Sequence, residues 1–244
     1  MSLLSIGFAL IVVVVMPLRA WLRLSRKSPA PSPFITIVET VTLIIVLLFL
    51  LRYEGVSVAA VGLARTTVDQ FLISAAISTA VIVGLDLLAL LLSRSAALRT
   101  EDEHGAAVRK QITTNSLPQG KELLGFVPVV LITAIWEELC FRGVALYLAP
   151  PTVFGTVSII ALSSTLFALH HLRRGITAAA YSGFYGVLFS LLYLGVGSLP
   201  PVIFAHAFGN LFVALYTGPR LLAAGHSRSS LSTKTERLNK IEWS

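Results

Sequence analysis

Apolar runs of about 20 residues recur along this chain, and a helix needs that length to cross the roughly 30 Å hydrocarbon core of a bilayer. Hydrophobic residues make up 55% of the 244 residues and charged residues only 13%, which exceeds what a soluble core requires. The sequence therefore predicts an all-α, polytopic transmembrane helix bundle of about seven spans. The expected spans are approximately 3–22, 34–52, 69–93, 123–147, 153–171, 176–196 and 200–217.

The distribution of positive charge predicts an orientation. The net charge is +7, and Lys and Arg gather after the first apolar run, between the third and fourth, at Arg173 and Arg174, and in the C-terminal tail. Seven spans bring these segments to one side, so the positive-inside rule predicts an N-terminus outside and a C-terminus in the cytoplasm. Because the cations form no continuous basic face, we expect the lipid bilayer as a partner and no nucleic acid.

Two polar stretches lie between and after the apolar runs without forming a second domain. Residues 94–121 are mixed in charge and contain Pro118 and Gly120, which predicts a cytoplasmic loop. Residues 220–244 are rich in Ser, Thr, Lys and Arg and are predicted to form a basic cytoplasmic tail. We therefore expect one transmembrane domain, residues 1–219, in a bacterial plasma membrane, and nothing in the sequence indicates an oligomeric state.

Two features of the apolar runs are interpreted as packing. Ser182, Gly186 and Ser190 recur every four residues and predict a small-residue face that lets two helices approach closely. The single cysteine, Cys140, excludes an intramolecular disulfide and is interpreted as a small apolar helix residue.

Three polar clusters interrupt the later apolar runs. A charge or an imidazole at membrane depth is costly unless it faces a cavity and finds partners, so these clusters predict the functional site. They are Glu137-Glu138-Leu139-Cys140-Phe141-Arg142, Phe167-Ala168-Leu169-His170-His171 and His206-Ala207-Phe208-Gly209-Asn210.

Helical spacing assigns different partners to the two carboxylates of the first cluster. Glu138 and Arg142 are four residues apart, so the guanidinium can neutralise that carboxylate on one helix face. Glu137 lies about 100° round the helix and is the freer carboxylate, suited to take up and release a proton. The alternative for all three residues is a structural ion-pair network.

The imidazoles of the other two clusters are sorted in the same way. Phe167 and His171 share one helix face, whereas His170 points about 100° away. His206 and Asn210 are four residues apart, so both side chains can converge on one cavity and supply two hydrogen-bond donors.

Taken in order, these motifs resemble a known family. Glu-Glu-x-x-x-Arg, Phe-x-x-x-His and His-x-x-x-Asn, each in its own apolar run, resemble the CPBP family of CAAX proteases and bacteriocin-processing proteins, which includes the Rce1-type prenyl-protein endopeptidases. The resemblance covers about 123–215, and Val61-Gly62-Leu63 is similar to a short Gly-Leu element found upstream in the family. It implies a CPBP/Rce1-like helix bundle that acts as an intramembrane endopeptidase on a membrane-tethered or lipidated, CAAX-like peptide or protein.

The resemblance also implies a role for each matching residue. Glu137 and His171 would activate a water for attack on a peptide carbonyl, and His206 and Asn210 would stabilise the oxyanion that develops. Structural or substrate-positioning roles fall to Glu138, Arg142 and Phe167. Family spacing from Phe167 selects His171, and a slip of one residue would select His170.

No cofactor is expected, although zinc stays an alternative. Glu137, His171 and His206 form a plausible zinc set. The chain contains no His-Glu-x-x-His helix, however, and Asn210 is a poor zinc ligand. Glutamate-type catalysis without a metal is therefore favoured.

Two other functions stay open. A non-catalytic member of the family would be a membrane scaffold or a bacteriocin-immunity protein that keeps the motifs for stability. A proton-coupled transporter would use Glu39, Asp86 and the cluster at Glu137 as a relay across the membrane. Helix-end or inter-helix polar contacts are the simpler interpretation of Glu39 and Asp86.

Overall fold

The structure is a computed structural model that describes residues 5, 7, 8, 32–64, 66–97, 121–172 and 175–217. Most of the expected first span at 3–22, most of the expected loop at 94–121 and the whole tail at 220–244 lie outside these residues. The orientation inferred from the charges of those segments stays a prediction.

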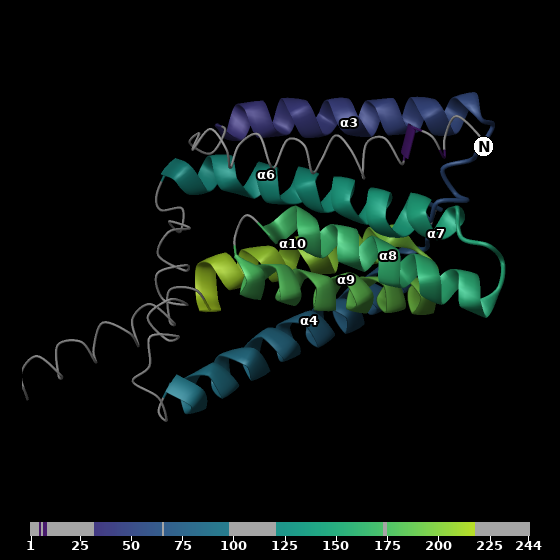
Figure 1. Ribbon diagram of the computed structural model, residues 1–244. Helices are drawn as coiled ribbons and strands as arrows, with labels where there is room; N and C mark the ends of the chain where they lie inside the picture. Colours follow the sequence, from purple (N-terminus) through teal and green to yellow (C-terminus); the bar gives the residue numbers. More distant parts are fainter. Residues whose placement is uncertain are drawn as a thin grey trace, which may run out of the picture.

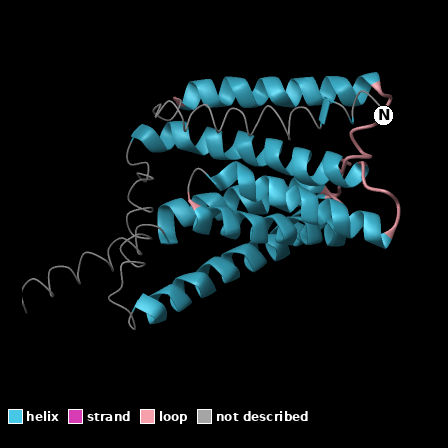
Figure 2. Cartoon of the chain, viewed as in Figure 1, coloured by secondary structure: helices cyan, strands magenta, loops and turns pink. Residues whose placement is uncertain are grey.

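Every regular element in the described residues is helical (Figure 2), so the expected all-α class is confirmed. Two of the elements, η2 and η4, are π-helical. The elements are α3 (Pro33–Tyr53), α4 (Val68–Ala97), α6 (Lys121–Glu138), η2 (Leu139–Val144), α7 (Ala145–Tyr147), α8 (Val153–His171), α9 (Ile176–Val196), α10 (Leu199–Phe212) and η4 (Val213–Thr217).

Six helical stretches in the described residues are long and apolar enough to cross a membrane. They are Pro33–Tyr53, Val68–Leu88, Leu124–Tyr147, Val153–His171, Ile176–Val196 and Leu199–Tyr216. The second to seventh expected spans are thereby confirmed, with small shifts at their ends. Helix α4 continues to Ala97 and α6 begins at Lys121, so the helices overlap the two ends of the loop expected at about 94–121. Helices α4 and α6 therefore extend beyond their apolar stretches into polar residues.

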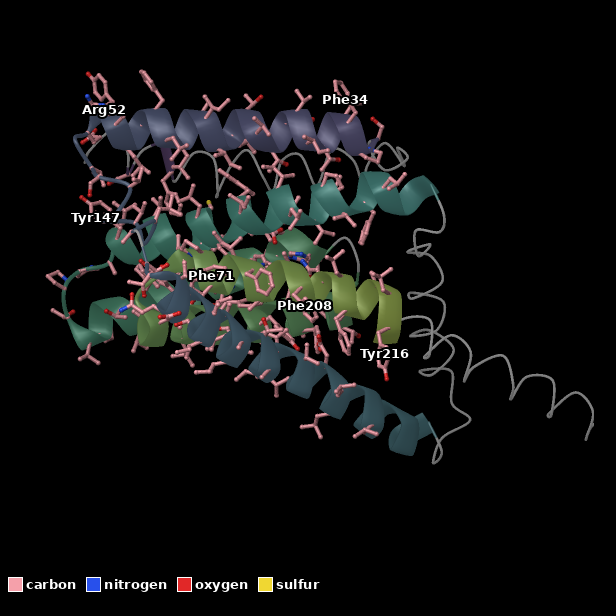
Figure 3. All side chains as sticks on the ribbon, turned by 180° about the vertical axis from the view of Figure 1, so that it is seen from behind. Phe34, Arg52, Phe71, Tyr147, Phe208 and Tyr216 are labelled. Carbon is pink, nitrogen blue, oxygen red and sulfur yellow. The ribbon has the colours of Figure 1, made fainter. Side chains whose placement is uncertain are left out.

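The helices form a bundle in which α10 lies between α6 and α4 (Figure 1). Helix α3 packs on the other side of α6, and α8 packs mainly against α9. Consequently α3 and α4 lie on opposite sides of the bundle, as Figures 1 and 3 both show. The three sequence motifs lie on α6 with η2, on α8 and on α10, and the packing brings these elements together.

Large apolar side chains cover the outside of the bundle. Phe34 on α3 points away from the other helices (Figure 3) and is 74% exposed, and Phe154 on α8 is 83% exposed. A soluble protein rarely exposes contiguous apolar surface on this scale. In a bilayer the same side chains face lipid.

The segment between α3 and α4 closes onto the start of α10. Gly62 has φ +85°, and its carbonyl oxygen accepts a hydrogen bond from the Leu199 N–H at 2.9 Å. A Cβ atom at Gly62 would lie 2.6 Å from the ring of Tyr193, so both conformation and space require glycine. Val61 beside it is fully buried. The Val61-Gly62-Leu63 element therefore anchors the helix that carries His206.

The predicted small-residue face of α9 is confirmed as a close helix contact. A Cβ atom at Gly186 would lie 2.9 Å from the Cβ of Ser164 on α8, and Ser190 Oγ donates to the Gly186 carbonyl oxygen at 2.9 Å. The absence of a side chain at Gly186 lets the two backbones approach, as small residues do between membrane helices.

Candidate active site

Glu137 and Glu138 are the last two residues of α6, directly before the π-helical segment η2. A π-helical turn is wider than an α-helical turn, and such turns are frequent at functional sites. Glu138 is 0% exposed, and Glu137 is 9% exposed. Both carboxylates therefore lie inside the bundle, and Glu137 is the more accessible of the two.

Arg142 neutralises Glu138 as the spacing predicts. A guanidinium nitrogen of Arg142 donates to Glu138 Oε1 at 2.9 Å, and a second donates to the carbonyl oxygen of Gly186 on α9 at 3.1 Å. The guanidinium also lies 4.9 Å from the centre of the Phe167 ring and 5.3 Å from that of Phe189. Arg142 therefore pairs with a buried carboxylate, binds α9 and stacks on two aromatic rings.

His206 lies between the two carboxylates. Its Nδ1 is 2.6 Å from Glu138 Oε1, and its Nε2 is 3.5 Å from Glu137 Oε2. Arg142 bonds the same Glu138 oxygen, and an ionised carboxylate can only accept, so this pairing makes Nδ1 of His206 the hydrogen-bond donor to Glu138. This bond leaves Nε2 directed at Glu137. The resulting sequence of groups, Glu138–His206–Glu137, is a tertiary contact that spacing alone did not predict.

Phe167 is the residue at which the three motifs meet. It is 3% exposed, and its ring centre lies 4.7 Å from that of His171 and 6.3 Å from that of His206. The guanidinium of Arg142 lies over the same ring. The structure therefore gives Phe167 a packing role at the centre of the site.

His171 and Asn210, the two other residues predicted to be catalytic, lie at the margin of the site, and His170 lies beside His171. His171 Nδ1 is 2.9 Å from the Phe167 carbonyl oxygen within α8, and the His170 ring centre lies 5.5 Å from that of His171. Asn210, one turn after His206, has an exposed side chain. The buried cluster itself consists of Glu137, Glu138, Arg142, Phe167 and His206.

Phe189 on α9 belongs to the site, but sequence reasoning did not predict it. Its ring stacks on the His206 imidazole, with 4.6 Å between ring centres and 21° between planes. A signal was present in the sequence: Tyr181, Tyr185 and Phe189 recur every four residues. Each precedes by one residue a member of the small-residue face, so an aromatic stripe runs beside that face.

Asp86 on α4 makes an inter-helix polar contact. Its Oδ1 accepts hydrogen bonds at 2.6 Å from the hydroxyls of both Tyr181 and Tyr185 on α9, and Asp86 is only 5% exposed. This confirms the simpler interpretation of Asp86. Glu39 lies on α3, on the opposite side of the bundle from α4 (Figure 1), so the described contacts give a transmembrane relay through both acids no support.

The residues considered as a zinc set do not form a preformed metal site. Within the described residues, no three His, Cys, Asp or Glu side chains are grouped so that they could hold a metal ion. His206 Nδ1 contacts Glu138 and His171 Nδ1 contacts a backbone carbonyl, so Nε2 is the ring atom that each histidine could offer to a metal. Zinc requires ligand atoms about 2 Å from a common point, and the structure does not gather Glu137, His171 and His206 in that way.

The comparison with known families bears on this cluster directly. Residues 119–212 match the family model described as Type II CAAX prenyl endopeptidase Rce1-like. This part of the chain is similar to that family and is called the Rce1-like segment below. The Rce1-like segment contains all three motifs, so the resemblance inferred from them is confirmed. Together with the six apolar helices, the match supports an integral membrane protein in which residues 119–212 are similar to a family of proteases. No curated protein and no solved structure matches the chain.

Proposed function

We propose that this protein is an intramembrane endopeptidase that hydrolyses a peptide bond of a membrane-associated or lipidated, CAAX-like protein or peptide. The observation that carries the proposal is the buried contact of His206 with Glu138 at 2.6 Å and Glu137 at 3.5 Å inside the Rce1-like segment. A buried ionic cluster of this kind is costly to maintain. Its position at the three family motifs favours a catalytic purpose over packing alone.

Glu137 is the proposed general base. Glu138 is bonded by Arg142 and is fully buried, whereas Glu137 keeps 9% exposure and lies 3.5 Å from Nε2 of His206. Glu137 takes a proton from a water as the water oxygen attacks the scissile carbonyl carbon, with His171 assisting as the resemblance implies. The proton is then transferred to the amide nitrogen, the C–N bond breaks, and a carboxylic acid and an amine are released.

Because Nδ1 of His206 is bonded to Glu138, the proposed oxyanion donors are Nε2 of His206, beside Glu137, and the side-chain amide of Asn210. They are one turn apart on α10, and the exposed side chain of Asn210 is accessible to a bound peptide. Hydrogen-bond donors fixed in a site of low dielectric stabilise the negative charge of a tetrahedral intermediate. Glu138, Arg142 and Phe167 have structural or substrate-positioning roles, and their burial favours the structural one.

The location of the site supports a membrane-tethered substrate. The carboxylates lie within a helix that is apolar enough to cross a membrane, so a peptide held at the bilayer by a lipid or an apolar segment reaches them with a smaller loss of entropy than a free peptide. A prenylated C-terminus is one such substrate.

The proposal is tested by cleavage of a membrane-tethered peptide library in detergent by the wild type and by Glu137→Gln. We expect the Gln variant to lose at least about 10³-fold in kcat, because the base is absent while the side-chain volume is kept. Thermal unfolding of both proteins controls for folding. Retained cleavage by Glu137→Gln would show that another group is the base.

Two further arms separate the alternatives. A chelator that abolishes wild-type cleavage, with zinc restoring it, would replace glutamate-type catalysis by zinc chemistry. No cleavage by the wild type, with the biological activity unchanged in Glu137→Gln, would favour a membrane scaffold or bacteriocin-immunity protein. Transport that depends on a gradient and on Asp86 would favour the transporter.

A further inference from the structure

Phe189 makes the most extensive ring contact with His206, although it belongs to none of the three motifs. Its side chain is 2% exposed, and the two rings are nearly parallel at 4.6 Å and 21°. Aromatic rings in this separation range attract one another beyond the burial of their surface. The Arg142 guanidinium lies 5.3 Å from the centre of the same Phe189 ring. Phe189 on α9 therefore contacts both Arg142 of the first motif and His206 of the third.

The stacking supplies a constraint that hydrogen bonding does not. The bond from Nδ1 to Glu138 fixes one atom of the His206 ring at 2.6 Å, but small rotations about the two side-chain torsions can still tilt the plane of the ring. Such a tilt would move Nε2 away from Glu137, from which it is 3.5 Å distant. A flat surface held against the imidazole removes this freedom because it fixes the plane of the ring.

Phe189 is itself held in place from the side of α4. The Tyr185 ring, one turn earlier on α9, lies 5.9 Å from the Phe189 ring. The Tyr185 hydroxyl donates to Asp86 on α4 at 2.6 Å. Tyr185 and Phe189 also share a buried apolar cluster with Ile82 of α4. The position of the Phe189 ring is thus tied to a second helix, which gives the buried Asp86 a role in the fold.

We propose that Phe189 is a positioning residue of the site: its ring fixes the plane of the His206 imidazole and so keeps Nε2 directed at Glu137. This inference rests on the proposed function for its effect on turnover. Its effect on the His206 ring is independent of what the protein cleaves.

The kinetic test compares three variants. Phe189→Leu removes the flat surface while keeping an apolar side chain, Phe189→Tyr keeps the ring, and Phe184→Leu is the matched control because Phe184 lies on the same helix with 54% exposure. We expect Phe189→Leu to lower kcat about 10- to 100-fold, since small misplacements of a catalytic group have effects of this size. KM should change by less than about threefold. The other two variants should keep kcat within about threefold of the wild type.

The structural test uses nuclear magnetic resonance of the full chain with labelled histidine in detergent. The chain contains five histidines, so the His206 signals can be assigned by a His206→Asn substitution. In the wild type and Phe189→Tyr, the ring protons of His206 should be shielded by the stacked ring, and the Nδ1 proton strongly deshielded by its short bond. Phe189→Leu should lose the shielding and broaden the Nδ1 proton signal.

The outcomes are distinct. Unchanged kcat or unchanged shielding in Phe189→Leu would overturn the proposal, and so would an equal loss of kcat in Phe189→Tyr. If Phe189→Leu does not fold, Phe189→Met refills the space with a flexible side chain and takes its place in both tests. If the wild type cleaves nothing, the proposed protease function fails, and the resonance test alone decides whether Phe189 fixes the ring.

Discussion

Arg142 has partners that its pairing with Glu138 does not explain. One guanidinium nitrogen bonds the carboxylate, another bonds the Gly186 carbonyl oxygen, and the guanidinium lies over Phe167. A lysine could supply the charge but neither the fork of donors nor the flat face. At the scale of single residues, Arg142 therefore connects the acidic motif to the backbone of α9.

The two adjacent histidines of α8 can be separated by substitution. The His171 ring contacts the Phe167 ring at a tilt, with 4.7 Å between ring centres and 59° between planes, whereas His170 lies on another face of the helix. We expect His171→Ala to lower kcat about 10²-fold, as loss of an acid–base group does. His170→Ala should lower it less than about threefold. The measurement is kcat on the same tethered peptide, with unfolding temperature as the control. A larger loss at His170 would move the assignment by one residue.

The residue contacts that could be predicted are those within one helix. Glu138 and Arg142 meet because four residues make about one turn, and this follows from the sequence without knowledge of the fold. The bond from His206 to Glu138 joins residues 68 positions apart and depends on how α10 packs against α6. Phe189 was missed for the same reason, since an aromatic residue in an apolar helix has many packing partners available.

Among whole elements, the helices were predictable and their details were not. Apolar length predicts six of the described helices because the bilayer fixes how long a span must be. The π-helical segment η2 was not predicted, since no local residue preference specifies it. The end of α4 at Ala97 was missed because apolar length marks where the lipid ends and not where the hydrogen-bonded helix ends.

The Gly62 turn is the element whose sequence requirement can be measured most directly. In Gly62→Ala, the left-handed φ costs about 1–2 kcal/mol, and the new methyl group would also meet Tyr193 at 2.6 Å. We therefore expect the free energy of unfolding to fall, and kcat with it, because Gly62 holds the start of α10. Thermal unfolding in detergent measures the first effect.

Gly55→Ala is the matched control for this prediction. Gly55 also has a positive φ, +69°, but a Cβ atom there has nothing within 4 Å. It should lose only the conformational part of the stability and none of the turnover. Equal losses of stability in the two variants would mean that the contact with Tyr193 adds nothing to the cost of a side chain at position 62.

At the scale of the whole molecule, the charges and the spans make a joint prediction about topology. Five apolar helices follow the segment between α3 and α4, so that segment and the C-terminal tail must lie on opposite sides of the membrane. The positive-inside rule then assigns the basic tail to the cytoplasm and the segment at 54–67 to the outside. Whether the N-terminus also lies outside depends on the expected first span at 3–22.

Single cysteines can test all three positions in intact cells. The native Cys140 is 0% exposed, so the wild type should not react with a membrane-impermeant maleimide. Ala59→Cys should be labelled from outside and Ser229→Cys only after permeabilisation, because the Lys and Arg of the tail resist translocation. Ser2→Cys should be labelled from outside if 3–22 spans the membrane.

Labelling of Ser229→Cys in intact cells would reverse the orientation. Labelling of Ala59→Cys and Ser229→Cys from the same side would mean that one of the five helices does not cross. Protection of Ser2→Cys alone would reduce the number of spans to six and place both termini in the cytoplasm, leaving the buried site unchanged.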